Sequence, residues 1–525
     1  MAGKTFLREA TGLVREIGAF DAFATNFAVL SPGLGIVQLF TYAAVAYPRS
    51  DVVLGMTIAL LPVVLWGIAY TYMSIASART GGDYVWISRV LGAPIGFMIS
   101  WVLLIVFFII VGLNANLFAT FYLSPMFLVL GHLSGASSLE TLGASLGTPE
   151  MAFLLGSLVI IVIGAVAIFG LKYAMTLQRI LLIVGVVGLV VIVGVLLSAS
   201  VSQFSALFNA YASQYGLSYD SVIKSAEGAG YVPGFLLAAT FMTLPYSSMM
   251  YGGFAFNVYA GSEIKNASRT QPIAILGCLV IGWFCFVIIG LGAYQAFGQD
   301  FLGAIGYLAA NAPSEYTLPL IPTLPYLIGI LANNIALTTV VEIGMMTWVI
   351  IIQIAYFIIL PRLMFAMAFD RCLPAKVADV NERYHTPVKA TLITIVFSIV
   401  GLYLFTFTTI FALLSNIILA LTVVWLVAGV TGSLFPYRRK ETFEAAPGFV
   451  KIKIAGVPLL TISGIVTVVF MIIASYFAWV ASPLVNNLVI VGVFLSGLIL
   501  YYVIKYVQST RGVQLEYLFK EIPPE

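Results

Sequence analysis

The sequence predicts an all-α integral membrane protein with about twelve transmembrane helices. Of its 525 residues, 61% are hydrophobic and only 9% are charged, and the mean hydropathy is +1.08. A soluble domain carries about 25% charged residues because water must solvate its surface, whereas a surface that faces lipid needs far fewer. Apolar runs of about 20 residues, the length that crosses a hydrocarbon core, recur along the whole chain. The basic residues alternate between the two sets of connecting loops.

The apolar runs give the expected spans, and no separate soluble domain interrupts them. Their predicted bounds are 18–45, 52–77, 94–123, 151–170, 175–200, 232–260, 272–297, 335–368, 388–407, 409–434, 457–481 and 485–506. The chain then divides into seven parts: a cytosolic N-terminal segment (1–17), five spans (18–200), an extracellular loop (201–231), five more spans (232–434), a cytosolic loop (435–456), two final spans (457–506) and a cytosolic tail (507–525).

The distribution of positive charge predicts the orientation. Of 24 lysine and arginine residues, 22 fall on one side, and Arg49 and Lys224 alone fall on the other. Short translocated loops are poor in basic residues, so both termini are expected in the cytoplasm. The first seventeen residues contain no apolar stretch of signal-peptide length, which favours a retained first span and a plasma-membrane location. A formal net charge of +3 gives no reason to expect nucleic acid.

Two predicted spans contain residues that destabilise a helix. Span 1 holds the stretch from Ser31 through Pro32 to Gly35, and span 6 holds Pro245 followed by Gly252-Gly253. Proline removes a backbone donor and glycine favours unwinding. Proline and glycine are also common in membrane helices without a special role. Breaks at corresponding places in two halves nevertheless indicate a binding site near the membrane midplane.

Four segments carry a resemblance to a known family. They are Arg15-Glu-Ile-Gly-Ala-Phe-Asp-Ala22 with Gly33-Leu-Gly-Ile36; Thr80-Gly-Gly-Asp-Tyr-Val-Trp86 with Gly92, Gly96 and Phe97; Tyr251-Gly-Gly-Phe254 with Glu263-Ile-Lys-Asn266, Arg269 and Pro272; and Arg362-Leu-Met-Phe-Ala-Met367 with Asp370, Leu373-Pro374 and Thr386-Pro387. These segments resemble the amino acid, polyamine and organocation transporter superfamily. That resemblance implies the inverted five-plus-five repeat of the bacterial leucine transporter, followed here by two further helices.

The resemblance also implies the function. It predicts a permease that moves amino acids by alternating access, with a small-molecule substrate bound at the broken spans. Leu34 stands where the family usually has serine or threonine, and Ala255 stands where many members have an acidic residue. These departures keep open an alternative within the same fold, a transporter of polyamines or other organic amines.

The residues expected at the substrate follow from the two breaks. Backbone amides at the start of the second half of span 1 favour a carboxylate, and carbonyls at the ends of the first halves favour an ammonium group. An aromatic residue of span 6 commonly covers the substrate in the family. The predicted substrate-binding residues are Ser31, Gly33, Leu34, Gly35, Met250, Tyr251, Gly253 and Phe254.

A polar stripe in span 8 is a second prediction. Thr338, Glu342, Gln353 and Tyr356 share one helix face and are expected to line an outer pathway, with proton coupling through Glu342 as one hypothesis. The other interpretation places Glu342 about 30 Å above Arg362, solvated at the external mouth. The sodium ligands that the fold can carry in span 8 fall at residues without side-chain oxygen, so no metal site is expected.

The predicted cytosolic loops contain charges that are candidates for an inner gate. They are Asp83, Glu263, Lys265, Arg269 and Asp370, which are also compatible with a purely topogenic or solvated role. No set of histidine, cysteine and acidic residues within the spans suits an enzyme, and no cofactor is expected. Broken helices in both halves favour alternating access over a channel. The sequence leaves the oligomeric state open.

Overall fold

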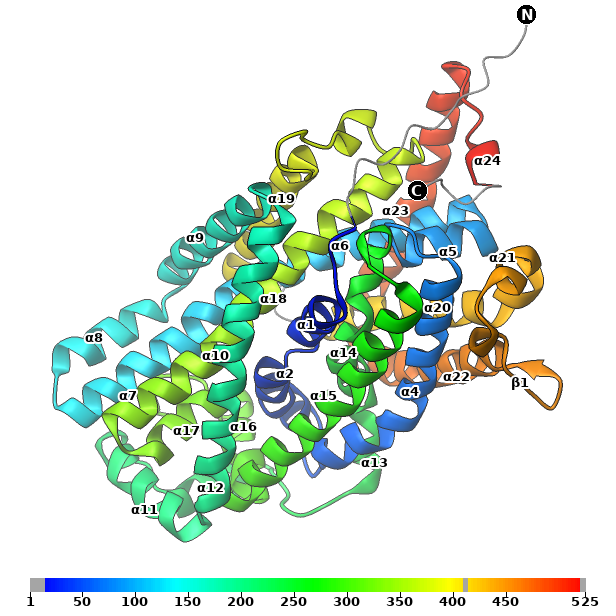
Figure 1. The fold of residues 1–525 in the computed structure, drawn as a ribbon. Coiled ribbons are helices and arrows are strands. Elements are labelled where there is room, and N and C mark those ends of the chain that lie inside the picture. Colours follow the sequence, from blue (N-terminus) through cyan, green and yellow to red (C-terminus); the bar gives the residue numbers. More distant parts are fainter. Residues whose placement is uncertain (1–14, 409–413, 520–525) are drawn as a thin grey trace, which may run out of the picture.

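The computed structural model describes residues 15–408 and 414–519, and it is a helical bundle around a central broken helix (Figure 1). Most of the N-terminal segment predicted at 1–17, the end of the tail predicted at 507–525 and the first residues of the span predicted at 409–434 lie outside the described residues. The basic residues Lys4, Arg8 and Lys520 lie outside them as well.

The first half of the chain forms the elements expected of five spans with short connecting helices. They are α1 (Ala19–Leu30), α2 (Pro32–Gln38), the π-helix η1 (Leu39–Ala43), α3 (Ala44–Ala46), α4 (Val52–Ala76), α5 (Asp83–Val90), α6 (Ala93–Leu117), the π-helix η2 (Phe118–Leu123), α7 (Ser124–Ser134), α8 (Ser137–Leu146), α9 (Pro149–Ile168) and α10 (Leu171–Ser198).

The second half begins with helices in the predicted extracellular loop. Its elements are α11 (Val201–Ala212), η3 (Ser213–Tyr215), α12 (Tyr219–Gly228), α13 (Leu237–Met242), α14 (Leu244–Tyr251), η4 (Gly252–Tyr259), η5 (Gly261–Glu263), α15 (Ala267–Phe297), α16 (Gln299–Asn311), α17 (Leu324–Ala332), α18 (Ile335–Phe369), η6 (Ala375–Ala378), α19 (Val388–Phe407) and α20 (Leu414–Arg438). After these come α21 (Lys440–Ala445), η8 (Gly448–Lys451), the hairpin β1 (Lys453–Ile454) and β2 (Val457–Pro458), α22 (Leu459–Ala481), α23 (Leu484–Thr510) and α24 (Leu515–Leu518).

The spans agree with the prediction in number and place. Within the described residues, eleven helical stretches are long and apolar enough to cross a membrane. The twelfth predicted span, 232–260, consists of α13, α14 and η4, each too short to cross alone. The third span is longer than the predicted 94–123, because α6, η2 and α7 continue to Ser134. The protein is an all-α integral membrane protein.

Corresponding members of the two five-span repeats pack against each other. α1 contacts η4, α4 contacts α15, α6 contacts α18, and α9 contacts α19. The two final helices lie outside this arrangement, with α22 against α20 and α23 against α6. In Figure 1, α1 and α2 occupy the middle of the bundle, with α10 and α18 on one side and α14 and α15 on the other. The broken helices therefore lie at the centre of the protein.

One close contact between the repeats is a crossing of glycines. A β-carbon on Gly188 of α10 would lie 2.4 Å from the Cα of Gly344 in α18, and the reverse contact would be 2.5 Å. Real β-carbons do not approach other atoms so closely, so the two backbones touch directly. A β-carbon on Gly185, in the same helix, would lie 3.1 Å from the indole of Trp348. At the contact between Gly188 and Gly344, α10 and α18 therefore cross without side chains between them.

Candidate substrate-binding site

The first span is broken at Ser31. α1 ends at Leu30, Ser31 has a left-handed backbone (φ 45°, ψ 71°), and α2 begins at Pro32, whose missing amide hydrogen suits a helix start. The Ser31 carbonyl accepts hydrogen bonds from the amides of Leu34 at 3.1 Å and Gly35 at 2.7 Å. Two of the three amides that we expected to face a substrate carboxylate are therefore used by the span itself.

The sixth span is broken after Tyr251. α14 gives way to η4, and Ala255 within η4 leaves the helical region (φ −126°, ψ 19°). The unwound backbone is held by amide side chains, because Asn26 of α1 accepts a hydrogen bond from the Asn257 amide at 2.8 Å. Asn257 in turn donates to Gln271 of α15 at 2.8 Å. The Asn26 side chain thereby satisfies a backbone amide of the unwound segment, and the bond between the Asn257 and Gln271 side chains links this segment to α15.

The two breaks touch each other through glycine. A β-carbon on Gly253 would come within 2.3 Å of the Leu30 nitrogen and 2.4 Å of the Val29 carbonyl carbon. A β-carbon on the neighbouring Gly252 would lie 2.4 Å from the Trp425 indole. The glycine pair read from the sequence as helix-breaking thus also permits close backbone contact between spans 1 and 6.

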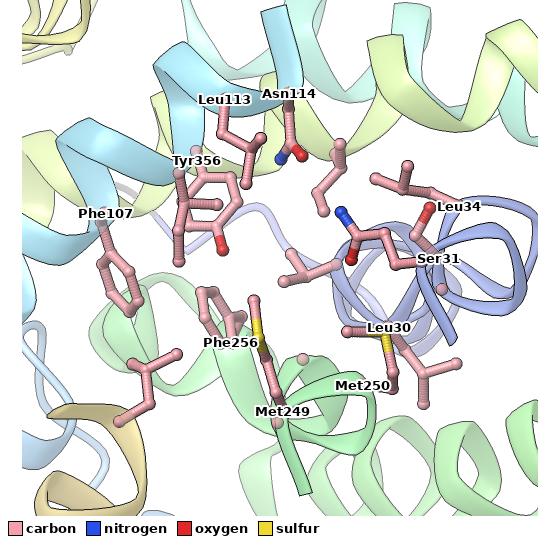
Figure 2. Close-up of a pocket in the computed structure, with 18 of the residues that line it drawn as sticks. Leu30, Ser31, Leu34, Phe107, Leu113, Asn114, Met249, Met250, Phe256 and Tyr356 are labelled. Carbon is pink, nitrogen blue, oxygen red and sulfur yellow. The ribbon is translucent and has the colours of Figure 1, made fainter. Parts of the chain in front are cut away.

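A cavity of about 50 Å³ lies where these breaks meet spans 3, 8 and 10 (Figure 2). Its lining is mostly aliphatic, aromatic and thioether: Val29, Leu30, Leu34, Phe107, Ile110, Leu113, Met249, Met250, Phe256, Ile352, Leu421 and Trp425. Its polar side chains are those of Ser31, Gln38, Asn114 and Tyr356, and none of the lining side chains in the described ranges is charged. A water needs about 10–15 Å³ by this measure, so the cavity has room for only a few waters until its flexible methionines move.

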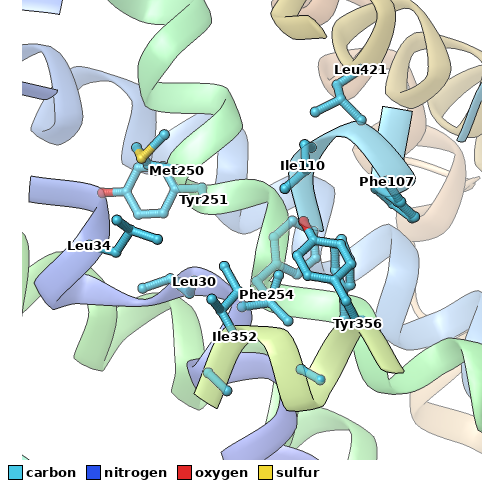
Figure 3. Packing of buried hydrophobic residues seen from close by; sticks show 14 of the residues in the cluster. Leu30, Leu34, Phe107, Ile110, Met250, Tyr251, Phe254, Ile352, Tyr356 and Leu421 are labelled. Atoms are coloured by element: carbon cyan, nitrogen blue, oxygen red, sulfur yellow. The ribbon is translucent and has the colours of Figure 1, made fainter. Parts of the chain in front are cut away.

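The structure brings most of the predicted substrate residues to this cavity. Its lining includes Ser31, Leu34, Gly35, Met250 and Gly253. The other three pack around it: Gly33 lies against the Trp348 ring, Tyr251 donates to the Met56 carbonyl at 3.1 Å, and the Phe254 ring lies 4.5 Å from that of Trp66. Figure 3 shows Tyr251 and Phe254 among other buried hydrophobic residues, including Leu30 and Met250. The aromatic ring of span 6 that reaches the cavity is Phe256.

Sequence reasoning missed the contribution of the third and tenth spans. Phe107, Ile110, Leu113 and Asn114 come from α6, and Leu421 and Trp425 come from α20. An apolar span gives no amphipathic signal that would distinguish its cavity-facing side, and Asn114 was the one available clue. Asn114 is 1% exposed, and its amide nitrogen has no hydrogen-bond partner in the protein. Figure 2 shows Asn114 and the Tyr356 hydroxyl pointing into the cavity.

Comparison with known proteins gives the family. The amino acid permease family model matches residues 17–501, which is most of the chain. The chain belongs to the amino acid permease family. The permease is 20% identical to the methylthioribose transporter of Bacillus subtilis (strain 168) over 395 residues, covering 74% of each chain. It is 24% identical to the branched-chain amino acid permease BcaP of Lactococcus lactis subsp. cremoris (strain MG1363) over 309 residues, or 54% of this chain and 58% of that protein. The protein is a transporter rather than an enzyme.

The polar residues predicted in span 8 of the permease have three different environments. Tyr356 lines the cavity, and Gln353 is fully buried and donates to the Val111 carbonyl of α6 at 2.8 Å. Glu342 is 1% exposed, and neither of its carboxylate oxygens has a hydrogen-bond partner. The interpretation of Glu342 as a solvated residue at the external mouth is wrong, because α17 and the third span cover this part of α18.

A larger cavity lies beside the outer half of span 1. It has a volume of about 620 Å³ and is bounded by η1, α3, α14, α16 and α17, including Tyr42, Tyr47, Tyr246, Leu302 and Leu324. Phe40 of η1 lines this cavity, whereas Gln38, the last residue of α2, lines the smaller one. Span 1 of the permease thus contributes to both cavities, and the larger one lies on the side that the charge distribution predicts to be external.

Two buried ion pairs lie on the side that the charge distribution predicts to be cytosolic. Glu263 of η5 accepts from Arg362 of α18 at 2.7 Å between Oε2 and Nη2, and their side chains are 2% and 4% exposed. Asp370 accepts from both terminal nitrogens of Arg89 at 2.6 and 2.9 Å, with side chains 1% and 2% exposed. A cavity of about 320 Å³ on this same side extends as far as Glu263. The arginines in these pairs were not among the predicted gate residues.

The remaining predicted gate residues divide into buried and exposed. Asp83, at the start of α5, is 1% exposed and accepts a hydrogen bond from the Tyr259 hydroxyl at 3.0 Å. Burial raises the pKa of Asp83 to about 6, although hydrogen bonds from Tyr70 and Tyr259 oppose the shift. Lys265 and Arg269 are exposed, and neither forms an ion pair with the described part of the chain.

The end of the described chain covers the second ion pair. The Phe519 ring lies 4.9 Å from the Arg89 guanidinium and 6.4 Å from the Tyr84 ring. Arg439 donates to the backbone carbonyls of Arg89 at 2.6 Å and of Phe519 at 3.3 Å. The segment after the last span is thereby attached to Arg89 of the second ion pair.

Proposed function

We propose that this permease transports neutral amino acids with apolar side chains across the plasma membrane by alternating access. The observation that carries the proposal is the uncharged, largely apolar cavity at the point where the two broken spans touch. A zwitterion with an apolar side chain has no net charge, so an ionised side chain in the site is not needed to balance it. Burying its side chain among leucine, methionine and aromatic residues favours binding by about 25 cal/mol per Å² of apolar area.

The broken spans give the two charged ends of such a substrate different surroundings. The carboxylate lies at the start of α2, where Gly33 has a first-turn amide and where the helix dipole favours an anion. The ammonium group faces the carbonyls at the ends of α1 and α14. The amides of Gln38 and Asn114 supply further neutral hydrogen-bonding groups.

The two sides of the cavity support an alternating mechanism. In the described state, the outer cavity is open next to η1, while Glu263 and Asp370 are paired with arginines on the cytosolic side. Opening toward the cytosol requires these pairs to separate and become hydrated. Substrate binding contracts the site around the ligand, and the contraction favours release of the inner pairs.

Two other classes of substrate are compatible with a transporter of this fold. A polyamine or another organic amine requires acidic groups near the ligand, and the substrate cavity has none among its lining residues. A neutral thioether sugar, the kind of ligand named for the relative from Bacillus subtilis, is favoured by a specific observation. The polar lining side chains are those of Ser31, Gln38, Asn114 and Tyr356, which are uncharged groups that suit hydroxyls.

Exchange in proteoliposomes distinguishes these classes. Purified permease is reconstituted with unlabelled compound inside and labelled compound outside, using L-leucine, L-methionine, putrescine and methylthioribose. We expect leucine and methionine each to be exchanged and to compete with each other for the permease. Putrescine should not affect the exchange of either amino acid. Exchange of methylthioribose alone would establish the second candidate, and exchange of putrescine alone would contradict the proposal.

The proposed orientation has its own test. The three cysteines of the chain are buried or half-buried, so an introduced surface cysteine dominates labelling. We expect an impermeant thiol reagent added to intact cells to label a cysteine at Lys224 and to spare one at Lys265. The reverse pattern would place the termini outside the cell.

A further inference from the structure

The environment of Glu342 is unusual for an acidic residue. Its side chain is buried where α17 and the third span pack against α18, and both carboxylate oxygens lack a hydrogen-bond partner. One oxygen lies 3.1 Å from the position that a β-carbon on Gly329 would occupy, so α17 approaches the carboxyl group directly. One turn earlier in α18, the Thr338 hydroxyl donates to the Gly329 carbonyl at 3.3 Å rather than to Glu342.

The groups around Glu342 do not provide a counter-charge. Tyr122 of η2 is the titratable neighbour that interacts with it electrostatically, and the Tyr122 hydroxyl is itself buried without a partner. Tyr42 of η1 lies beyond Tyr122 and lines the outer cavity. The facing part of α10 around Gly188 is apolar, and Val129 is the neighbour from α7. No arginine, lysine or histidine of the described residues pairs with Glu342.

An ionised carboxylate in this position is unfavourable. Burying an isolated charge without a partner costs several kcal/mol, and a group in that position avoids the cost by binding a proton. The protonated acid carries no charge and needs no counter-ion, so the neutral form suits the described arrangement better than the carboxylate does. Closing α17 over Glu342 is therefore linked to proton binding.

We propose that Glu342 is a proton-binding site that couples substrate transport to the proton gradient. The inference rests on the proposed transport function and names its coupling ion. A proton from the outer cavity binds the Glu342 carboxylate, forming a neutral acid, and the neutral acid permits the closed packing of α17 and η2. When the cytosolic side opens and water reaches the site, the acid releases its proton and becomes an anion again.

The position of Glu342 explains how a proton and a substrate act on one element. Ile352 and Tyr356, which line the substrate cavity, follow Glu342 in the same helix by ten and fourteen residues, or about 15 and 21 Å. Asn114 and Tyr122 are similarly joined through α6 and η2. π-helical segments often occur at functional sites, and here η1 lines the outer cavity while η2 carries Tyr122, the neighbour of Glu342.

The test uses reconstituted permease and labelled L-leucine. A pH gradient of about one unit, acidic outside, supports up to about tenfold accumulation if one proton moves with each substrate. We expect Glu342→Gln, which imitates the neutral acid, to exchange leucine at close to the wild-type rate and to lose accumulation. Glu150→Gln, an exposed acid at the start of α9, serves as the control and should keep both activities. Accumulation that is unchanged in Glu342→Gln, or absent from the wild type while exchange persists, would overturn the proposal.

Infrared spectroscopy tests the site without transport. At neutral pH, the purified wild type should show a carbonyl stretch of a protonated carboxylic acid that Glu342→Gln lacks and Glu150→Gln retains. Absence of that band would overturn the proposal even if leucine is transported. Presence of the band without leucine exchange would instead support the proton site and contradict the proposed substrate.

Discussion

Gly253 lies so close to Leu30 that a β-carbon on Gly253 would come within 2.3 Å of the Leu30 backbone nitrogen. This contact holds the two breaks together without side chains. We expect Gly253→Ala to lower stability by about 1–3 kcal/mol, the usual cost of overpacking, and to abolish leucine exchange. Thermal unfolding in detergent and exchange in proteoliposomes measure the two effects. Gly277→Ala is the matched control, because a β-carbon at Gly277 in α15 meets nothing within 4 Å, and unfolding equal to that control would contradict the prediction.

Replacing Asn114 should preserve or raise the stability of the protein while it weakens the affinity for substrate. Its buried amide nitrogen has no partner in the protein, so Asn114→Leu removes an unsatisfied group and should leave the protein equally stable or more stable. If the amide bonds to substrate, the same change weakens substrate binding by about 1 kcal/mol, or roughly five- to tenfold. Gln353→Leu is the comparison, because it loses a formed bond to the Val111 carbonyl and should destabilise the protein. Unchanged leucine affinity in Asn114→Leu would exclude this contact.

Asp83 predicts a dependence of stability on pH. Burial raises its pKa to about 6, so the folded protein binds a proton that the unfolded chain releases at lower pH. The resulting stability is fully present below about pH 4 and is lost as the pH rises through about 6, with a size on the order of 3 kcal/mol. We expect Asp83→Asn to remove this component from the difference in unfolding temperature between pH 5 and pH 7. A mutant with the full wild-type difference would show that other groups produce it.

The ion pair between Arg89 and Asp370 predicts a leak on the cytosolic side. Asp370→Asn leaves the buried guanidinium without its counter-ion, which costs about 3–5 kcal/mol in buried pairs. Cys372 reports the effect, because its thiol lies 3.8 Å from the Tyr84 hydroxyl, and burial raises its pKa to about 12. We expect a cytosolic thiol reagent to modify Cys372 much faster in Asp370→Asn. Asp379→Asn is the control, since its pair with Lys389 is exposed.

Removing the Phe519 ring should also speed the labelling of Cys372, but by less than Asp370→Asn does. Its ring covers the Arg89 guanidinium at 4.9 Å, and a contact of this kind contributes about 0.5–2 kcal/mol. We expect Phe519→Ala to increase Cys372 labelling by a few-fold, and Phe519→Tyr to preserve the wild-type rate. Tyr517→Ala is a control two residues away, where the side chain is 62% exposed. Equal labelling in Phe519→Ala and the wild type would show that the segment does not stabilise the closed side.

Length and hydropathy located the spans because both are local properties of the chain. The prediction of 52–77 corresponds to α4 at Val52–Ala76, and the break at Ser31 follows directly from Pro32. The extracellular helices α11, α12, α16 and α17 were not predicted, because short connecting helices have no apolar run of membrane length. The sixth span was expected to break, and it does. The backbone contact between Gly253 and span 1 could not be predicted, because it depends on how the two spans pack together.

The site was harder to predict because it depends on which helix faces meet. Asn114 sits in a uniformly apolar span, and nothing in the sequence shows whether it faces the cavity, lipid or another helix. Glu342 was placed by counting residues along a straight helix, which gives a height but not the cover that α17 supplies. Glu263 and Asp370 were named as candidate gate residues from their motifs, whereas the arginines that pair with them, Arg362 and Arg89, come from segments far away in sequence.

The glycine crossing between Gly188 and Gly344 makes α18 a lever with unequal arms. Arg362 lies eighteen residues from Gly344 along the helix, about 27 Å, whereas Glu342 lies two residues from it, about 3 Å. A rotation of about 10° about this pivot would displace Arg362 by roughly 5 Å and Glu342 by roughly 0.5 Å, taking the rise per residue as the arm length. In the proposed coupling, a small movement that starts with proton binding at Glu342 would become large enough at Arg362 to separate it from Glu263.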